Sequence, residues 1–268
     1  MDIGSILGLV IGFLGILLGF LIEAHWHFSA LSGLIQVASI FIVFGGTIGA
    51  VILTFPMDEL KKLGSALKLV FTKTRHDEVG IINKMIDLAE KSRKDGLLTL
   101  EREVKNESNP LIKKGLSLVV DGISSELARD ILELDVDLRE KMHESSVKIL
   151  EAAGGYSPTM GVIGTVMGMV NILGSLGSDM EKLGGSIAVA FIATFYGVLF
   201  ANVVYLPMAG RLKAKAEQER MVNMLIVEGV LAIQTGENPR LIRERLNLSL
   251  FEKLKGEETS EEDKVDDR

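Results

Sequence analysis

The chain has 268 residues, 47% of them hydrophobic, and a mean hydropathy of +0.32, which predicts a membrane protein with a large soluble part. It contains no cysteine, which excludes disulfides and thiolate metal sites. The net charge is −7, and residues 256–268 carry seven acidic against two basic side chains. We therefore expect a disordered acidic tail there, and nothing in the composition suggests nucleic-acid binding.

Two apolar segments open the chain. Ile3–Ile22 is uncharged and long enough for one transmembrane helix, and it has no signal-peptide features, so we expect a retained span. Ser29–Phe55 is predicted as the second span, which makes residues 1–55 a membrane region. The loop between the spans holds His25 and His27. A metal site is one interpretation of this pair, but without further ligands the pair is more often only polar.

Residues 56–151 form a hydrophilic block that begins with closely spaced lysines and an arginine, the pattern of a cytoplasmic face. Helical periodicity recurs through the block, and no segment alternates as a strand would. The sequence therefore predicts an all-helical cytoplasmic domain between spans two and three. Its predicted helices are Met57–Phe71, Val79–Arg93, Leu97–Val104, Leu111–Ser125 and Leu127–Leu150, the last continuous with the third span.

Residues 152–210 contain the third and fourth spans, joined by a short loop at Gly174–Lys182. The third span places three glycines, Gly161, Gly164 and Gly168, on one helical face. Two interpretations stay open for this face with its proline and hydroxyls: close packing of small residues, or a cavity or ion path. Basic residues follow the fourth span, so both termini are expected in the cytoplasm, with C-terminal helices in residues 211–255.

The four spans contain no Asp, Glu, Lys, Arg or His, although an ion carrier normally needs an ionisable group at depth. Either the chain conducts nothing, or a partner supplies the carboxylate. Catalytic motifs and a cofactor-binding motif are missing, so we expect no enzyme and no cofactor. Arg93 and Glu101 flank Gly96 in SRKDGLLTLE. They would share a face if the helix continued, or they are ordinary solvated charges.

Four segments together resemble the MotA/PomA/MotP family of flagellar motor stator subunits, within the MotA/TolQ/ExbB superfamily. They are SRKDGLLTLE (92–101), LSLVVDG (116–122), GGYSPTMGVIGTVMGMV (154–170) and AFIATFYGVLFANVVYLPMA (190–209). The order of two spans, a block of about a hundred residues, two spans and a basic exit agrees with the family. The resemblance covers nearly the whole chain except the acidic tail.

The resemblance implies a pentameric ring of this subunit around a dimer of a MotB-type partner. That partner has a single span with an intramembrane Asp and a peptidoglycan-binding domain. Pro158 and Pro207 match the prolines that flank the ion path, and Thr165 and Thr194 match hydroxyl positions of sodium-driven members. Tyr196 is a further polar side chain in the fourth span, and we include it among the candidate ion-path residues.

Arg93 and Glu101 match the charged pair that faces the rotor switch protein. The implied function is a stator subunit that converts ion-motive force into torque, in the cell membrane, with H⁺ or Na⁺ as the transported ion. Proton-driven members often have Ala at the position of Thr165, which leaves the ion open. The alternative is a TolQ/ExbB-like energiser of an envelope transport system, although such proteins have three spans.

Overall fold

The computed structural model describes residues 2–72, 77–175 and 180–248, and these contain helices and no strand. The predicted acidic tail lies outside the described residues, as do Lys73 and Arg75 of the basic run that follows the second span. Four helical segments are long and apolar enough to cross a membrane, which confirms the predicted all-α membrane fold. The chain divides into two compact units, residues 1–74 with 143–215 and residues 75–142 with 216–268.

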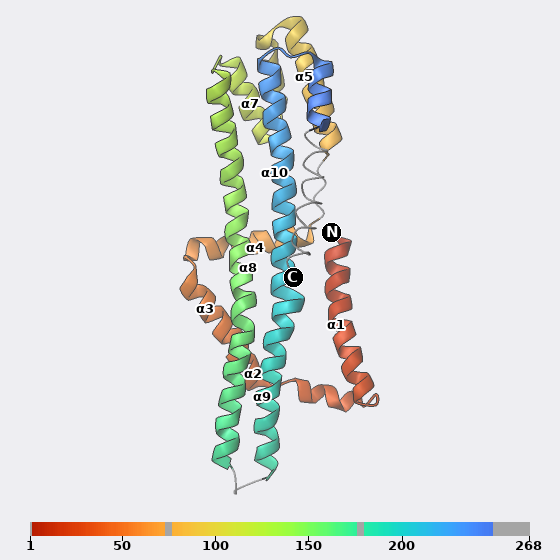
Figure 1. The fold of residues 1–268 in the computed structure, drawn as a ribbon, viewed down its shortest axis with the longest axis vertical. Helices are drawn as coiled ribbons and strands as arrows, with labels where there is room; N and C mark the ends of the chain where they lie inside the picture. Colours follow the sequence, from red (N-terminus) through yellow and green to blue (C-terminus); the bar gives the residue numbers. More distant parts are fainter. Residues whose placement is uncertain (1, 73–76, 176–179, 249–268) are drawn as a thin grey trace. The chain divides into compact units, whose positions relative to one another are not determined.

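The first unit contains the spans. Its elements are α1 (Ile3–Glu23), the 3₁₀ segment η1 (Phe28–Leu34), α2 (Val37–Ile40), the π-helical turn η2 (Phe41–Gly45), α3 (Gly46–Thr54), α4 (Met57–Phe71), α9 (Met180–Phe200) and the π-helical turn η4 (Ala201–Tyr205). Two long helices, α8 (Ser125–Ser175) and α10 (Leu206–Gln234), contribute residues to both units (Figure 1). The prediction that the helix before the third span continues into it is thus confirmed.

The second span is shorter than predicted. Residues 28–34 form the 3₁₀ segment η1, and the apolar helix starts only at Val37. Ile35 and Gln36 are extended, with φ of −94° and −122°, so the hydrogen-bond ladder is interrupted before α2. The predicted loop at Gly174–Lys182 is also shorter, because α8 reaches Ser175 and α9 begins at Met180.

Helix α4 belongs to the unit of the spans. It is amphipathic, and Ala66 and Val70 are buried with Val147, Leu150 and other apolar residues of α8 and α10. Ser145 of α8 donates a hydrogen bond of 2.6 Å to the Glu59 carboxylate, which fixes the same helix from its polar side. Structure in this unit therefore extends beyond the four spans to a helix that follows the second of them.

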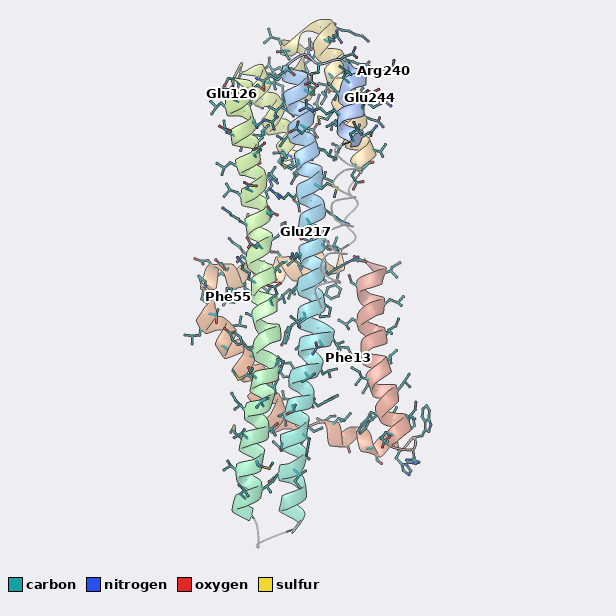
Figure 2. The ribbon with its side chains drawn as sticks, viewed as in Figure 1. Phe13, Phe55, Glu126, Glu217, Arg240 and Glu244 are labelled. Atoms are coloured by element: carbon teal, nitrogen blue, oxygen red, sulfur yellow. The ribbon has the colours of Figure 1, made fainter. Side chains whose placement is uncertain are left out.

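Side chains of α1 are mostly exposed, as expected of a helix that faces lipid or another protein. Only 6% of its most apolar window is buried within the chain. Phe13 of this helix points toward α9 and lies 6.0 Å from Phe200 between ring centroids (Figure 2). Apolar exposure of this extent is stable in a bilayer and not in water.

The second unit is a helical domain with its own core. It comprises α5 (Glu78–Asp95), η3 (Leu97–Thr99), α6 (Leu100–Asn106), α7 (Pro110–Val120), the first part of α8, the last part of α10 and helical residues 239–248. The face predicted for α5 is buried as expected: Ile82, Met85, Ile86 and Ala89 all lie in this core. Glycines allow close approach, since a Cβ on Gly115 would lie 2.8 Å from Val230.

Ion pairs border this core. Glu228 of α10 binds Arg129 of α8 at 2.9 Å and Arg245 at 2.7 Å. Lys84 binds the buried Glu107 at 2.7 Å. Burial raises the pKa of the Glu107 carboxyl, but Lys84 and backbone N–H donors outweigh it and the pKa is lowered overall. The loop between α6 and α7 is thereby attached to α5.

Candidate functional site

The third and fourth spans meet along a seam of small residues between α8 and α9. A Cβ on Gly161 would lie 2.9 Å from the Ala193 carbonyl oxygen, and a Cβ on Gly168 would lie 2.7 Å from the Ala190 Cβ. A Cβ on Gly164 would likewise lie too close to the Ala193 Cβ. Because no side chain fits at these three positions, the glycine face packs helix against helix. The first of the two interpretations offered by the sequence is therefore realised along this face.

Two threonine hydroxyls meet at this seam. Thr165 of α8 and Thr194 of α9, both half-buried, are hydrogen-bonded to each other. The Thr165 Oγ1 lies 3.2 Å from the Gly161 carbonyl oxygen, one turn earlier, and 3.1 Å from the Ala190 carbonyl oxygen. Thr194 Oγ1 lies 3.4 Å from the Gly161 oxygen. The spans thus bring together four oxygens, two hydroxyl and two carbonyl, which we call the oxygen cluster.

Pro158 lies inside α8, two turns from Thr165 toward the start of the helix. Its ring nitrogen has no hydrogen, so the Gly154 carbonyl loses its usual helical donor. The Ser157 hydroxyl beside it is fully buried and has no hydrogen-bond partner within the described part of the chain. Across the seam, a Cβ on Gly197 of α9 would lie 2.6 Å from the Ser157 carbonyl oxygen. Pro158 therefore lies where the two spans are in backbone contact.

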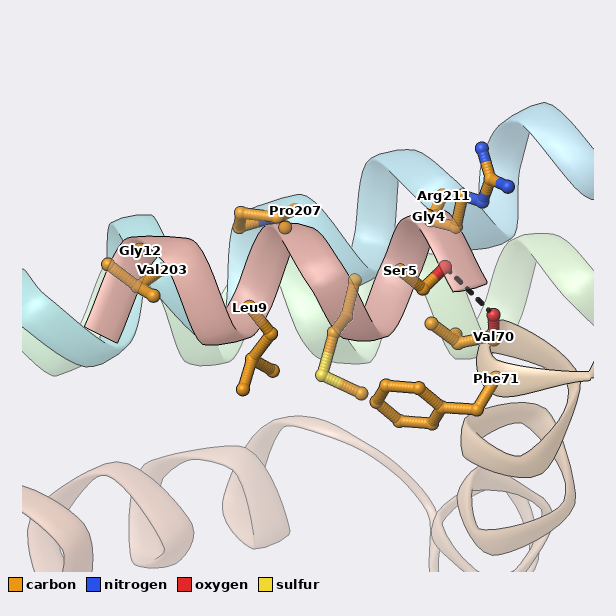
Figure 3. A pocket seen from close by; sticks show the side chains of 11 residues that line it. Gly4, Ser5, Leu9, Gly12, Val70, Phe71, Val203, Pro207 and Arg211 are labelled. Carbon is orange, nitrogen blue, oxygen red and sulfur yellow. Dashed lines mark hydrogen bonds between the residues drawn. The ribbon is translucent and has the colours of Figure 1, made fainter. Parts of the chain in front are cut away.

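Pro207 lies near the start of α10, directly after the π-helical turn η4. A proline ring clashes with the carbonyl four residues earlier, here Val203, and a π turn removes that clash by widening the helix. Pro207 lines a cavity against α1 (Figure 3). Neither proline contributes a polar group to the oxygen cluster.

Tyr196 has its hydroxyl hydrogen-bonded outside the oxygen cluster. Its hydroxyl donates to the Leu34 carbonyl oxygen, and its ring lies 6.4 Å from that of Phe44 between centroids. This bond attaches α9 to the end of η1. A role of Tyr196 in the ion path stays a prediction.

Arg93 and Glu101 are both exposed in the helical domain. Helix α5 ends at Asp95, and Gly96 has φ of +85°, a conformation that favours glycine, so the two residues do not share one helix. Glu101 pairs with Lys105 at 3.0 Å on α6. The charges border a sharp turn on the surface, which is compatible with partner contact and with simple solvation.

The histidine pair in the loop after α1 is bound locally. The Nδ1 of His25 bonds to the Glu23 carbonyl oxygen and that of His27 to the Ala24 carbonyl oxygen, each at 3.0 Å. Within the described ranges, no group of three or more metal-ligating side chains gathers.

The sequence and the fold both match known proteins. Residues 6–96 match the model of the motility protein A N-terminal region, and residues 103–224 match that of the MotA/TolQ/ExbB proton channel family. Motility protein A of Bacillus subtilis is 34% identical over 251 residues, which cover 93% of this chain and 91% of that protein. The chain belongs to the motility protein A family.

Two solved structures extend the likeness to three dimensions. The flagellar MotAB stator complex from Bacillus subtilis has a chain that matches with a TM-score of 0.81 and 34% identity, over 92% of this chain and 95% of that chain. The C. jejuni MotAB structure matches with a TM-score of 0.85 and 27% identity, over 93% and 96%. This motility protein A homologue is a flagellar stator subunit and an integral protein of the inner membrane.

The role of Lys215 in this motility protein A homologue could not be predicted from the sequence. Lys215 of α10 is buried, and its ammonium donates to the carbonyl oxygens of Leu69 (2.8 Å), Val70 (3.0 Å) and Thr72 (2.6 Å) at the end of α4. It also lies 3.2 Å from the carboxylate of Asp2, which accepts a hydrogen bond from Arg211. The Arg211 guanidinium holds the pKa of Asp2 well below its usual range.

The Lys215 ammonium supplies further donors to carbonyls at a helix end, where intrahelical donors run out. The Asp2 backbone N–H adds a bond of 2.8 Å to the Phe71 carbonyl oxygen. The start of α1, the end of α4 and α10 are thereby joined at one point. The sequence shows basic residues after the fourth span, but it contains no signal that selects Lys215 among them.

Proposed function

We propose that this stator subunit forms an ion channel with a single-span partner of the MotB type and converts ion-motive force into torque on the rotor. The observation that carries the proposal is a contrast within the spans. Residues 3–22, 37–54, 152–175 and 184–210 contain no Asp, Glu, Lys, Arg or His, yet α8 and α9 join four oxygens in one cluster. Such a wall can orient a proton or a sodium ion but cannot carry its charge.

The partner supplies the missing charge as an intramembrane Asp that faces the oxygen cluster. Thr165 and Thr194 contact the ion or the Asp, and Pro158 and Pro207 couple its occupancy to movement of the helices that hold them. Tyr196 lines the same path. Its hydroxyl donates to the Leu34 carbonyl oxygen.

We further propose a pentameric ring of this subunit around the partner, with both termini in the cytoplasm. Basic side chains after α3 and after the fourth span support that orientation. The helical domain then faces the rotor switch protein and presents Arg93 and Glu101 to it. The four spans, together with the match to the N-terminal motility protein A model, favour this assignment over a three-span energiser.

Ion flux into liposomes tests whether this chain needs the partner's Asp to conduct ions. The purified chain alone is expected to pass neither protons nor sodium, whereas the chain purified with its MotB-type partner passes one of them once activated. A partner with its intramembrane Asp changed to Asn is the matched control and should abolish flux. Selective flux through the chain alone would refute the proposal, because it would require a carrier that these spans do not contain.

A further inference from the structure

A cavity of about 370 Å³ lies between α1, the end of α4 and the start of α10 (Figure 3). Its walls are apolar except for Ser5, whose hydroxyl is bonded to the Val70 carbonyl oxygen, and Arg211. The volume falls within the range of about 300–1,000 Å³ that small-molecule sites occupy. On α1 the lining includes Gly4, Gly8 and Gly12.

The helices touch at both ends of this cavity, so the space between them is part of the fold. At one end a Cβ on Gly12 would lie 3.1 Å from Val203. At the other end Asp2 binds Arg211 and Lys215. Between these contacts, a Cβ on Gly8 would have no atom within 4 Å. Gly8 is therefore not required for helix packing, and it leaves room that any larger side chain would fill.

The polar end of the cavity carries a net positive charge. Arg211 and Lys215 contribute two cations against the single carboxylate of Asp2, which leaves one positive charge. The Arg211 side chain is 47% exposed, and a guanidinium has five N–H donors, so its bond to Asp2 leaves donors for a second anion. Basic pockets between transmembrane helices at a membrane surface bind anionic lipid head groups.

We propose that this cavity binds an anionic phospholipid, with an acyl chain against Gly8, Leu9 and Met208 and its phosphate at Arg211. An apolar wall inside the membrane and a cation at its edge match the two parts of such a molecule. A transmembrane helix is about 10 Å across and cannot enter between helices that touch at Gly12 and Asp2. A flexible acyl chain can enter this space.

The bound lipid would fill the space beside Pro207 and so support α10 where its helix begins. This inference goes beyond the proposed function, because it concerns a ligand site on the side of α10 that faces α1. It needs neither a partner subunit nor ion flow. Its test therefore reads lipid binding and is independent of the outcome of the flux experiment.

Native mass spectrometry of the full chain in mild detergent, titrated with dioleoyl phosphatidylglycerol or dioleoyl phosphatidylcholine, tests the proposal. We expect one phosphatidylglycerol per chain, bound about fivefold more tightly than phosphatidylcholine, from one net charge at the site. Gly8→Leu should reduce binding at least tenfold by filling the cavity. Gly15→Leu is the matched control on α1, since Gly15 also has open space around it but does not line the cavity.

Two charge variants separate recognition from general damage to the fold. Arg211→Gln should bring the two lipids to equal affinity, whereas Asp2→Asn should strengthen the preference for phosphatidylglycerol. Loss of structure cannot produce opposite shifts. Equal affinity of the unsubstituted chain for both lipids, or unchanged binding by Gly8→Leu, would overturn the proposal.

A photoreactive acyl chain on phosphatidylglycerol gives a measurement that needs no substitution. Its label should map to Leu9, Val203 or Met208 in the unsubstituted protein. Labels confined to other faces of the spans would overturn the proposal. A change in the number of chains per complex in Gly8→Leu, with lipid retained, would likewise overturn it and assign the cavity to contact between copies.

Discussion

Removal of the Lys215 ammonium tests the contact that joins α1, α4 and α10. Lys215→Met keeps most of the side-chain volume but removes the ammonium's hydrogen bonds to the carbonyls of Leu69, Val70 and Thr72. A hydrogen bond from a charged donor contributes about 1.5 kcal/mol at the lower end of its range. Water can replace the bond at the exposed Thr72, so about 3 kcal/mol should be lost from the free energy of unfolding.

For a chain of this size, 1 kcal/mol corresponds to about 2–4 °C in Tm, so we expect Lys215→Met to unfold about 6–12 °C earlier. Circular dichroism at 222 nm, at one fixed scan rate in one detergent, measures the shift. Lys213→Met is the matched control, because Lys213 is exposed on the same helix and its loss should cost less than about 0.5 kcal/mol. If Lys215→Met unfolds within 2 °C of the unsubstituted chain, the reasoning is refuted.

The same contact predicts a pH dependence. The pKa of Asp2 is lowered from its usual value of 3.8, chiefly by Arg211. A carboxyl whose folded pKa is depressed stabilises the fold fully above its unfolded pKa, and that contribution is lost as the pH falls through the folded value. The contact should therefore persist down to pH 4, and Asp2→Asn should lower Tm equally at pH 5 and pH 7.

Three further predictions concern the site and the seam. If sodium drives the motor, swimming should slow as sodium is withdrawn at fixed pH, and Thr165→Ala should impair swimming severely. If swimming does not depend on sodium and Thr165→Ala swims normally, the Thr165 hydroxyl serves only helix packing. Charge reversal at Arg93 or Glu101 should reduce motility without loss of membrane assembly, and a compensating charge reversal on the rotor protein should partly restore motility. If both variants swim normally at every load, Arg93 and Glu101 are only solvated surface charges. Gly168→Ala should destabilise the protein by about 1–3 kcal/mol in thermal unfolding, because its methyl meets α9, while Gly155→Ala, in open space, should be neutral or stabilising; equal effects would contradict the seam geometry.

Features that follow from helical periodicity could be predicted from the sequence. The buried face of α5 and the glycine face of α8 each repeat every three or four residues, and both lie where that spacing places them. The continuity of α8 was also predictable, since neither glycine nor proline interrupts residues 127–150. Local spacing determines these features, and a single chain contains that information.

Features that depend on local geometry or on distant partners could not be predicted. Residues 29–35 carry no charge and continue into the apolar helix that follows, so the sequence does not reveal that η1 is 3₁₀ and that the span starts at Val37. Lys215 is one cation in a basic run, and its importance comes from α4, more than 140 residues earlier. Residue propensities and composition do not describe contacts between segments that are far apart in the sequence.

The candidate site lies between these cases. The resemblance selected Thr165 and Thr194, but only the structure shows that their hydroxyls are bonded to each other across 29 residues. A hydroxyl direction depends on a side-chain torsion and on neighbouring carbonyls, which no spacing rule specifies. The structure also directs Tyr196 toward Leu34, a bond between segments 162 residues apart.

The oxygen cluster explains why Thr165→Ala can distinguish sodium from the proton as the coupling ion. Thr165 and Thr194 have two hydroxyl hydrogens between them, and the carbonyls of Gly161 and Ala190 can accept both. In the structure the two hydroxyls bond to each other. If this bond opened and both hydrogens turned to the carbonyls, the hydroxyl lone pairs would be free to replace part of the hydration shell of sodium. With one hydrogen turned to the carboxylate of the proposed partner's Asp, the charged form of that Asp would be favoured. A sodium site and a proton site thus need opposite hydroxyl orientations, and Thr165→Ala removes lone pairs from the first but a hydrogen-bond donor from the second.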